Sequence, residues 1–283
     1  MTGTEPPPRS YLYAPGSDRR LMEKALASAA DAVVLDLEDA VAPSRKAEAR
    51  AAVAELLRAR SGKPVLVRIN AEASGLAEDD LAAIAGPWLA GVRLPKVESP
   101  DWVRAVAAQL DRHGCATRIH PLIESALGLE RAYEIARAHA RVATLGLGEA
   151  DLGADLGISD PAGLRYARSR VVAAARAAGL PAPVQSVYPH LRDLDGLRRS
   201  TEEGRAMGFF GRSVIHPAQL PVVNAVFTPD EEEVRRAREL VAALEAAEAD
   251  GTGALALPDG RFVDRAVVAS ARRTLALARA AHG

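Results

Sequence analysis

Short apolar runs alternate with longer amphipathic segments along most of the chain. The run at 32–37 is almost entirely Val and Leu, a composition typical of a parallel strand buried on both faces. Small residues and turn signals separate the two kinds of segment. The pattern predicts strands over 11–14, 32–37, 64–69, 91–94, 117–123, 142–147, 183–188 and 213–215. It predicts helices over 20–30, 44–60, 78–85, 101–112, 126–139, 163–178, 194–207 and 218–227.

About eight strand–helix units in succession indicate an α/β protein with a (β/α)8 TIM barrel rather than a doubly wound sheet. Beyond residue 228 the pattern changes to a charged helix, a Gly-rich break, a hairpin and a last helix, expected at 230–249, 250–253, around 258–260 and at 266–281. We therefore expect a TIM-barrel catalytic domain over 1–228 and a C-terminal extension over 229–283. The extension would act as a lid or oligomerisation arm, or simply pack on the outside of the barrel.

The bulk composition limits the classes of partner. A formal net charge of −1 leaves no general positive field for nucleic acid or anionic lipid, and 48% hydrophobic residues allow a large core. The lone Cys115 cannot form an internal disulfide and is interpreted as structural. Residues 1–10 lack the apolar stretch of a signal peptide, and no run is long enough to cross a bilayer. A cytoplasmic protein without membrane or nucleic-acid partners is therefore expected.

Polar residues follow several of the predicted strands, and in a barrel the carboxyl ends of the strands meet at one face. These residues are Asp36, Glu38, Arg68, Lys96, Glu124, Asp151 and His216. Glu124 and Asp151 are carboxylates with no Cys or His beside them, a donor set that suits Mg²⁺, with Mn²⁺ as the alternative. Each residue alone is as well explained as a solvated loop residue or a helix cap. As a pair they predict a metal site.

Arg68 lies in an otherwise apolar strand, where a buried guanidinium needs a carboxylate or an anionic ligand. We expect a ligand role, with a structural ion pair as the alternative. Asp36 and Glu38 share one side of their strand by two-residue spacing, so they would hold waters around the metal. The alternative is that Asp39 or Glu38 braces the next loop. His216 is expected to be a hydrogen-bonded structural residue rather than a base.

A metal site with an arginine nearby suits carbon–carbon bond cleavage or formation beside a carbonyl. Mg²⁺ would chelate a 2-oxo or 2-hydroxy acid while Arg68 stabilises the developing oxyanion, which is aldol or Claisen chemistry. A second enzyme class is a Schiff-base aldolase with Lys96 as the nucleophile, but it leaves the carboxylate pair without a purpose. A pure binding protein would not need this set of residues.

A series of short motifs occurs in an order that resembles a known family. The motifs are YLYAPG at 11–16, VLDLEDAV at 34–41, VRIN at 67–70, LPK at 94–96, IE at 123–124, GEADL at 148–152, YARS at 166–169 and IHPAQ at 215–219. As a set, from Arg9 almost to the C-terminus, they are similar to citrate lyase β-subunit-like proteins of the HpcH/HpaI aldolase superfamily. That superfamily includes malyl-CoA, β-methylmalyl-CoA and citramalyl-CoA lyases.

The resemblance implies a TIM barrel that forms homotrimers or homohexamers. It implies that Glu124 and Asp151 hold Mg²⁺, that Asp36 and Glu38 hold waters, and that Arg68 contacts the substrate carbonyl or carboxylate. It also implies that coenzyme A, as part of the substrate, is held by the first loop and nearby basic residues: Pro15, Gly16, Arg20, Lys24 and Lys96. In the CoA-lyase members an aspartate in the C-terminal lid of a neighbouring subunit is acid or base at the acetyl methyl carbon, and Asp264 matches it.

The expected function is therefore a Mg²⁺-dependent lyase that cleaves a 3-hydroxyacyl-CoA, such as malyl-CoA, β-methylmalyl-CoA or citramalyl-CoA, to an acyl-CoA and a 2-oxo acid. Malyl-CoA thioester hydrolysis, or the reverse malate-synthase-like condensation, would use the same site. The other alternative is the β-subunit of a citrate lyase complex, acting on citryl groups on an acyl-carrier protein. Many relatives carry Asp where Gln185 and His190 stand here, so the choice of substrate stays open.

Overall fold

The computed structural model describes residues 7–59, 62–249, 255–256 and 262–281. The chain separates into two compact units, one of residues 8–224 and one of residues 225–283 together with 1–7. The larger unit carries the strand-end residues singled out above. The role expected for 229–283 as a lid or oligomerisation arm stays a prediction.

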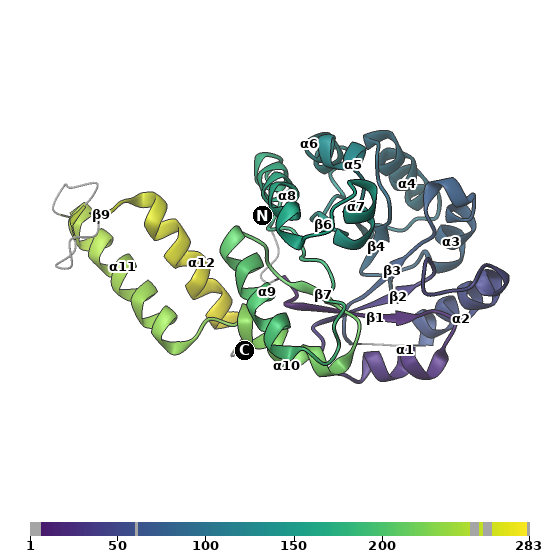
Figure 1. Ribbon diagram of the computed structural model, residues 1–283, viewed down its shortest axis with the longest axis horizontal. Helices are drawn as coiled ribbons and strands as arrows, with labels where there is room; N and C mark the ends of the chain where they lie inside the picture. The colour runs from purple at the N-terminus through teal and green to yellow at the C-terminus, as the bar shows by residue number, and fades with distance from the viewer. Residues whose placement is uncertain (1–6, 60–61, 250–254, 257–261, 282–283) are drawn as a thin grey trace. The chain divides into compact units, whose positions relative to one another are not determined.

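The larger unit is an α/β fold in which seven parallel strands curl in the order β6-β5-β4-β3-β2-β1-β7 (Figure 1). The strands are β1 (Ser10–Pro15), β2 (Ala32–Asp36), β3 (Val65–Arg68), β4 (Gly91–Leu94), β5 (Arg118–Ile123), β6 (Gly146–Leu147) and β7 (Arg212–Val214). All five residues of β2 are buried, as its Val and Leu composition predicts. Because the strands are parallel, their carboxyl ends lie at the same edge of the sheet.

Two residues of the predicted strand at 183–188 connect the edge strands β6 and β7. Val184 forms a parallel bridge with Gly146, and Gln185 forms one with Arg212. The other residues of the segment form no strand, and Pro183 has no N–H to donate to a ladder. Strand pairing therefore continues from β6 through residues 184 and 185 to β7 and β1.

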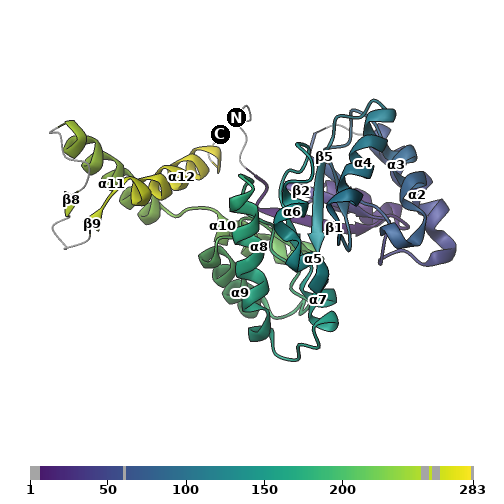
Figure 2. The same ribbon diagram turned by 90° about the horizontal axis from the view of Figure 1, so that it is seen from above.

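Helices follow most of the strands and lie around the outside of the sheet in Figures 1 and 2. They are α1 (Arg19–Leu26), α2 (Lys46–Ala59), α3 (Ala77–Ile84), α4 (Pro100–Arg112), α5 (Ala126–Glu130), α6 (Ala132–Ala136), α7 (Glu149–Asp155), α8 (Arg165–Ala177), α9 (Leu194–Met207) and α10 (Leu220–Phe227). The predicted helix at 126–139 is split into α5 and α6 at Arg131, whose backbone leaves the helical region. The alternation of strands and helices is otherwise as the sequence predicts.

The segment that leads to Asp151 differs from its prediction. The strand expected at 142–147 is reduced to Gly146–Leu147, while Val142 keeps a single bridge to Ile119. Helix α7 begins at Glu149, so Asp151 belongs to the first turn of a helix rather than to a loop. A carboxylate in the first turn of a helix is favoured by the unpaired N–H groups there.

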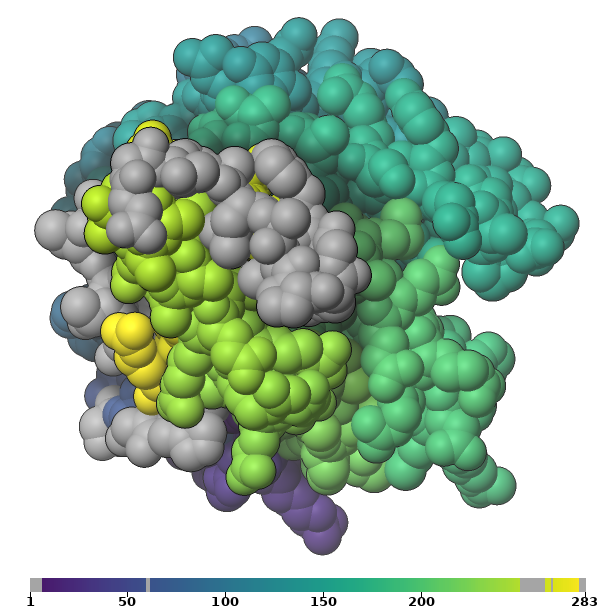
Figure 3. All heavy atoms as spheres, turned by 90° about the vertical axis from the view of Figure 1, so that its left-hand side faces the viewer, coloured from purple at the N-terminus to yellow at the C-terminus, as the bar shows by residue number. Residues whose placement is uncertain are grey.

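The smaller unit contains a helical hairpin. Helix α11 (Glu231–Ala249) packs against α12 (Arg265–Ala281), and β8 (Leu255–Ala256) pairs antiparallel with β9 (Phe262–Val263) between them. The hairpin expected around 258–260 is confirmed by this pairing, although its turn lies outside the described residues, as does the break at 250–253. Leu244, Val263 and Val268 form the apolar core of the unit. Figure 3 looks onto α11, in yellow-green, whose charged side chains are mostly exposed.

Within the described part of the chain, no helix combines the length with the apolar content that a bilayer crossing requires.

A buried carboxylate on α3 holds the segment that follows β3. Asp80, with no exposed surface, accepts hydrogen bonds from the backbone N–H and side-chain Nδ2 of Asn70 at 2.9 and 2.6 Å. It also accepts one from Arg50 Nε of α2 at 2.7 Å. Asn70 comes two residues after Arg68, so this network fixes the backbone at the end of β3.

We predict that Asp80→Ala lowers the free energy of unfolding by about 3 kcal/mol, because Arg50 and both Asn70 donors lose their buried acceptor. Urea denaturation measures the change. Asp79→Ala is the matched control: its side chain is 67% exposed and lies 3.3 Å from the same arginine, so its cost should stay below about 1 kcal/mol. Equal losses for the two variants would show that the buried network does not stabilise this corner.

Candidate active site

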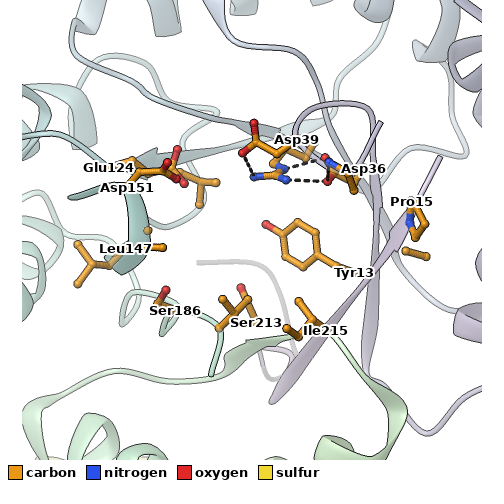
Figure 4. A pocket seen from close by; sticks show the side chains of 17 residues that line it. Tyr13, Pro15, Asp36, Asp39, Glu124, Leu147, Asp151, Ser186, Ser213 and Ile215 are labelled. Carbon is orange, nitrogen blue, oxygen red and sulfur yellow. Dashed lines mark hydrogen bonds and ion pairs between the residues drawn. The ribbon is translucent and has the colours of Figure 1, made fainter. Parts of the chain in front are cut away.

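A cavity of about 460 Å³ opens at the carboxyl ends of the strands (Figure 4). The sequence-predicted residues that line it are Pro15, Asp36, Arg68, Glu124 and Asp151. They come from β1, β2, β3, the end of β5 and the first turn of α7. Side chains distant in the sequence therefore meet at the face that the strand pattern predicts.

Asp36 and Arg68 form the most fully bonded pair in the cavity wall. Arg68 Nε and Nη2 donate to the two Asp36 carboxylate oxygens at 2.7 and 2.6 Å. The same carboxylate accepts backbone N–H groups of Glu38 at 2.9 Å and Ala40 at 3.2 Å. Burial on its own would lower the pKa of Arg68, but the hydrogen bonds and charge of Asp36 outweigh it and raise that pKa. The guanidinium is therefore permanently charged and held in one orientation.

Glu38 extends this network to Lys96. Its Oε2 lies 2.8 Å from Arg68 Nη1 as an ion pair without hydrogen-bond geometry, and its Oε1 accepts from Lys96 Nζ at 2.6 Å. Burial raises the pKa of Glu38, partly offset by the charge of Arg68 and the hydrogen bond from Lys96. Burial on its own would lower the pKa of Lys96, but the hydrogen bond to Glu38 and the charge of Glu38 raise it by more than burial lowers it. Its pKa therefore lies above the ordinary value. A charged, paired ammonium does not suit the Schiff-base alternative, which needs a neutral amine.

Glu124 is 5% exposed and held by backbone contacts. Its Oε2 accepts the backbone N–H of Lys96 at 2.9 Å, and Lys96 has a left-handed φ of 49° that among the described residues is otherwise confined to glycines. Gly148 packs against the other side of the carboxylate, where an added Cβ would lie 2.3 Å from Glu124 Oε1. The position of the Glu124 side chain therefore depends on the left-handed backbone of Lys96 and on the absence of a side chain at Gly148.

The electrostatics of Glu124 favour a bound cation. Burial, together with the charges of Glu38 and Asp151, raises the pKa of Glu124 to about 7, although the N–H of Lys96 and the charge of Arg68 oppose the rise. A divalent cation beside Glu124 and Asp151 would offset that burial and repulsion.

The ligand set fits an oxygen-preferring metal with open positions. No group of three or more His, Cys, Asp or Glu able to hold a metal occurs among the described residues. Glu124 and Asp151 would thus supply two carboxylates and leave the remaining positions to water and substrate oxygens. This is the way Mg²⁺ is commonly bound in proteins.

Other predicted residues lie outside the cavity lining. Gly16 donates its N–H to the carbonyl of Asp36 at 2.8 Å, so it supports the wall from behind. Arg20 and Lys24 are exposed on α1. His216 accepts the N–H of Ala218 at 3.1 Å through Nδ1 and caps a short 3-10 helix, which confirms the structural interpretation.

Asp264 belongs to the smaller unit. It lies directly before α12, where its Oδ1 accepts the N–H of Val267 at 3.0 Å. Cys115 is buried, as its structural interpretation predicts.

The cavity also contains residues that sequence reasoning missed. Tyr13, Ser186 and Ser213 line it, and a buried arginine, Arg93, lies behind two of them. Serines near strand ends carry no distinctive signal. Arg93, however, lies in the strand Gly91–Leu94 just as Arg68 lies in its own, and the same argument about a guanidinium among apolar residues would have found it.

A cavity at the carboxyl ends of parallel strands, with two acidic side chains converging near a fixed arginine, is an arrangement typical of metal-assisted enzymes on α/β folds. The chain belongs to the HpcH/HpaI aldolase/citrate lyase family, whose profile matches residues 9–217. This confirms the resemblance found in the motifs.

Relatives with names and solved structures match almost the whole chain. A (3S)-malyl-CoA thioesterase of Cereibacter sphaeroides is 41% identical, covering 97% of this chain and 95% of that protein. The human mitochondrial citramalyl-CoA lyase is 34% identical over 96% of this chain and 86% of its own. The crystal structure of CitE from Mycobacterium tuberculosis, in complex with magnesium, acetoacetate and coenzyme A, is similar with a TM-score of 0.81 and 33% identity, covering 95% and 97% of the two chains.

We predict that Gly148→Ala weakens Mg²⁺ or Mn²⁺ binding at least about tenfold, because the added methyl group displaces the Glu124 carboxylate. Isothermal titration calorimetry with MnCl₂ measures the affinity. The backbone φ of Gly148 is −103°, so alanine brings no conformational strain of its own.

Gly153→Ala, in the helix that Gly148 precedes, is the control, since an added Cβ there meets no atom within 4 Å. It should leave Mn²⁺ affinity unchanged and leave stability the same or slightly higher. Unaltered Mn²⁺ affinity in Gly148→Ala would contradict the assignment of Glu124 as a ligand.

Proposed function

We propose that this protein is a divalent-metal-dependent enzyme that acts on a 3-hydroxyacyl coenzyme A ester. It cleaves the bond between C2 and C3 and releases an acyl-CoA and a 2-oxo acid. The observation that carries the proposal is the convergence of Glu124 and Asp151 with the charged, fixed Arg68 in one cavity. Family membership supports it, as do the names of the relatives above. We further interpret the curled sheet, joined through residues 184 and 185, as a (β/α)8 barrel.

Different residues of this chain would have different roles in such a reaction. A cation held by Glu124 and Asp151 supplies Lewis-acid polarisation of substrate oxygens. The Asp36 bonds use Arg68 Nε and one N–H of Nη2, so N–H groups on Nη1 and Nη2 remain for a substrate oxygen. As the C3 hydroxyl loses its proton and the C2–C3 electron pair moves toward C1, negative charge grows on the thioester oxygen. Arg68 would stabilise it there.

The product side of the reaction needs a proton donor at C2. Asp264 is the candidate from the family resemblance, supplied by a neighbouring subunit of a homotrimer or homohexamer. The pantetheine and nucleotide parts of coenzyme A would run past Pro15 and Gly16 toward the exposed cations of α1, Arg20 and Lys24.

Thioester hydrolysis is a second candidate, because the relative with 41% identity is named a (3S)-malyl-CoA thioesterase. Hydrolysis would direct water at C1 within the same cavity. The two reactions differ in products: cleavage of malyl-CoA gives acetyl-CoA and glyoxylate, whereas hydrolysis gives malate and free coenzyme A.

We expect malyl-CoA or citramalyl-CoA to be consumed in the presence of Mg²⁺ and to be stable in EDTA, since the metal polarises the reacting oxygens. Chromatography of the products, together with a thiol assay, separates acetyl-CoA from free coenzyme A. Consumption that persists in EDTA would refute the metal-dependent proposal.

Arg68→Lys should lower kcat/KM at least about a hundredfold, because the planar guanidinium geometry is lost while the charge stays.

The role of Asp264 predicts complementation between subunits. Asp264→Asn and Arg68→Lys should each be nearly inactive alone. Oligomers that contain both variant chains should regain part of the activity, because some sites combine an intact Arg68 with an intact Asp264 from the neighbour. Activity of refolded mixtures against unmixed samples measures the gain. No gain in mixtures shown to be hetero-oligomeric would place Asp264 outside a shared site.

A further inference from the structure

The two candidate metal ligands differ in how they are held, although Figure 4 shows both at one end of the cavity. Glu124 is buried and packed against the backbone of Lys96 and against Gly148. Asp151 is exposed, and within the described chain its carboxylate accepts no hydrogen bond. Strand β6, which leads to Asp151, is only two residues long. The place of Asp151 beside Glu124 therefore depends on the contacts that hold helix α7.

Helix α7 is held at its first residue by Arg168 of α8. Arg168 Nε and Nη2 donate to the two carboxylate oxygens of Glu149 at 2.9 and 2.7 Å. The arginine is 8% exposed, and the hydrogen bonds and charge of Glu149 raise its pKa, although burial opposes the rise. A guanidinium joined to a carboxylate at two points fixes orientation as well as distance. Since Asp151 lies two residues further along, the turn that carries it is tied to α8.

Helix α8 is a firm support for this contact. It packs against α6, and the residues of its buried face include Ala167, Val171, Ala174 and Ala175. Arg168 Nη1 also lies 3.7 Å from Glu203 Oε1 of α9. The position of Arg168 is therefore set by packed helices rather than by a side chain that moves freely in solvent.

The other end of α7 is tied to the segment that carries Glu124. Asp155, the last residue of α7, accepts the backbone N–H of Ala126 through Oδ2 at 2.7 Å. Ala126 begins α5 and comes two residues after Glu124. This hydrogen bond joins the helix of one candidate ligand to the chain beside the other. The contacts of Arg168 with Glu149 and of Asp155 with Ala126 are the two anchors of α7.

We propose that Arg168 and Asp155 are positioning residues for the metal site, which keep Asp151 in place beside Glu124 by anchoring α7 at both ends. The inference rests on the proposed function for the presence of a divalent cation. Neither side chain lines the cavity, so each acts through the helix rather than on the substrate or the metal. The inference also gives a role to the arginine of the YARS motif at 166–169, which the proposed reaction does not use.

Charge and position predict opposite effects for the loss of Arg168. Removing a cation near the site should strengthen the binding of a divalent metal by electrostatics alone. Loss of the anchor should weaken it, because Asp151 is no longer held beside Glu124. We expect Arg168→Met to weaken Mn²⁺ binding about tenfold, measured by isothermal titration calorimetry on the full-length protein. Arg168→Lys keeps the charge and can keep one hydrogen bond to Glu149, so its affinity should lie between the two.

Arg165→Met is the matched control on the same helix. The Arg165 side chain is 74% exposed and lies 3.6 Å from Glu203, so the variant loses the same charge without loosening α7. Its Mn²⁺ affinity should be unchanged or slightly higher. If Arg168→Met and Arg165→Met bind Mn²⁺ equally well, with circular dichroism showing both folded, Arg168 does not position the site.

The second anchor is tested by two variants with the same change of charge. Asp155 is exposed, so both Asp155→Ala and Asp155→Asn should fold. Asparagine keeps a carbonyl oxygen that can accept the N–H of Ala126, whereas alanine does not. Asp155→Ala should therefore bind Mn²⁺ at least about threefold more weakly than Asp155→Asn. Identical affinities would overturn the proposal at this end of the helix.

Turnover of the CoA esters by the same preparations separates this proposal from the proposed function. Variants that bind Mn²⁺ in the expected order, in a protein whose wild type consumes no ester, would overturn the proposed function and support the anchors. Ester turnover that stops in EDTA, together with equal Mn²⁺ affinities in all variants, would do the reverse. A wild-type protein that binds no Mn²⁺ would overturn both.

Discussion

The rest of the site depends on the paired hydrogen bonds between the Asp36 carboxylate and the Arg68 guanidinium. The carboxylate lies at the end of a strand buried on both faces, where a charge is tolerated only if it is fully hydrogen-bonded. Arg68 from the next strand supplies two of its donors, and the turn after β2 supplies two backbone N–H groups. The same contacts set the direction of the guanidinium and the path of the chain to Glu38. A single buried carboxylate thereby fixes both the guanidinium of Arg68 and the turn that follows β2.

A chain of ion pairs and hydrogen bonds leads from Asp36 and Arg68 to Glu124, a candidate metal ligand. Glu38 lies between Arg68 and Lys96, and the backbone of Lys96, held in the left-handed region, donates its N–H to Glu124. Gly148 leaves room for the same carboxylate from the opposite side. Glu124 is thus pre-positioned by rigid backbone neighbours rather than by flexible side chains, which is the condition under which a carboxylate can hold a cation in a defined place.

Much of the fold and part of the site follow from local patterns. The apolar runs predicted each of the seven strands, and β4 and α9 have the predicted bounds. The position of polar residues at strand ends predicted that Asp36, Arg68, Glu124 and Asp151 would converge, which the cavity confirms. The pattern of apolar residues did not predict strand length where few ladder hydrogen bonds form, as in β6 and the segment after Pro183. In those places ladder hydrogen bonds to neighbouring strands, rather than composition, decide how long a strand is.

What the sequence by itself determined is the alternation of elements, the burial of β2, the family and the acidic residues at the strand ends, because all of these are written in short stretches of chain. Only the tertiary structure decided that Arg68 is fixed by Asp36, that Gly148 makes room for Glu124, and that Arg93 lies behind the hydroxyls of Tyr13 and Ser213. These contacts join residues between 24 and 120 positions apart. They depend on the register and curvature of the sheet, which no local pattern encodes.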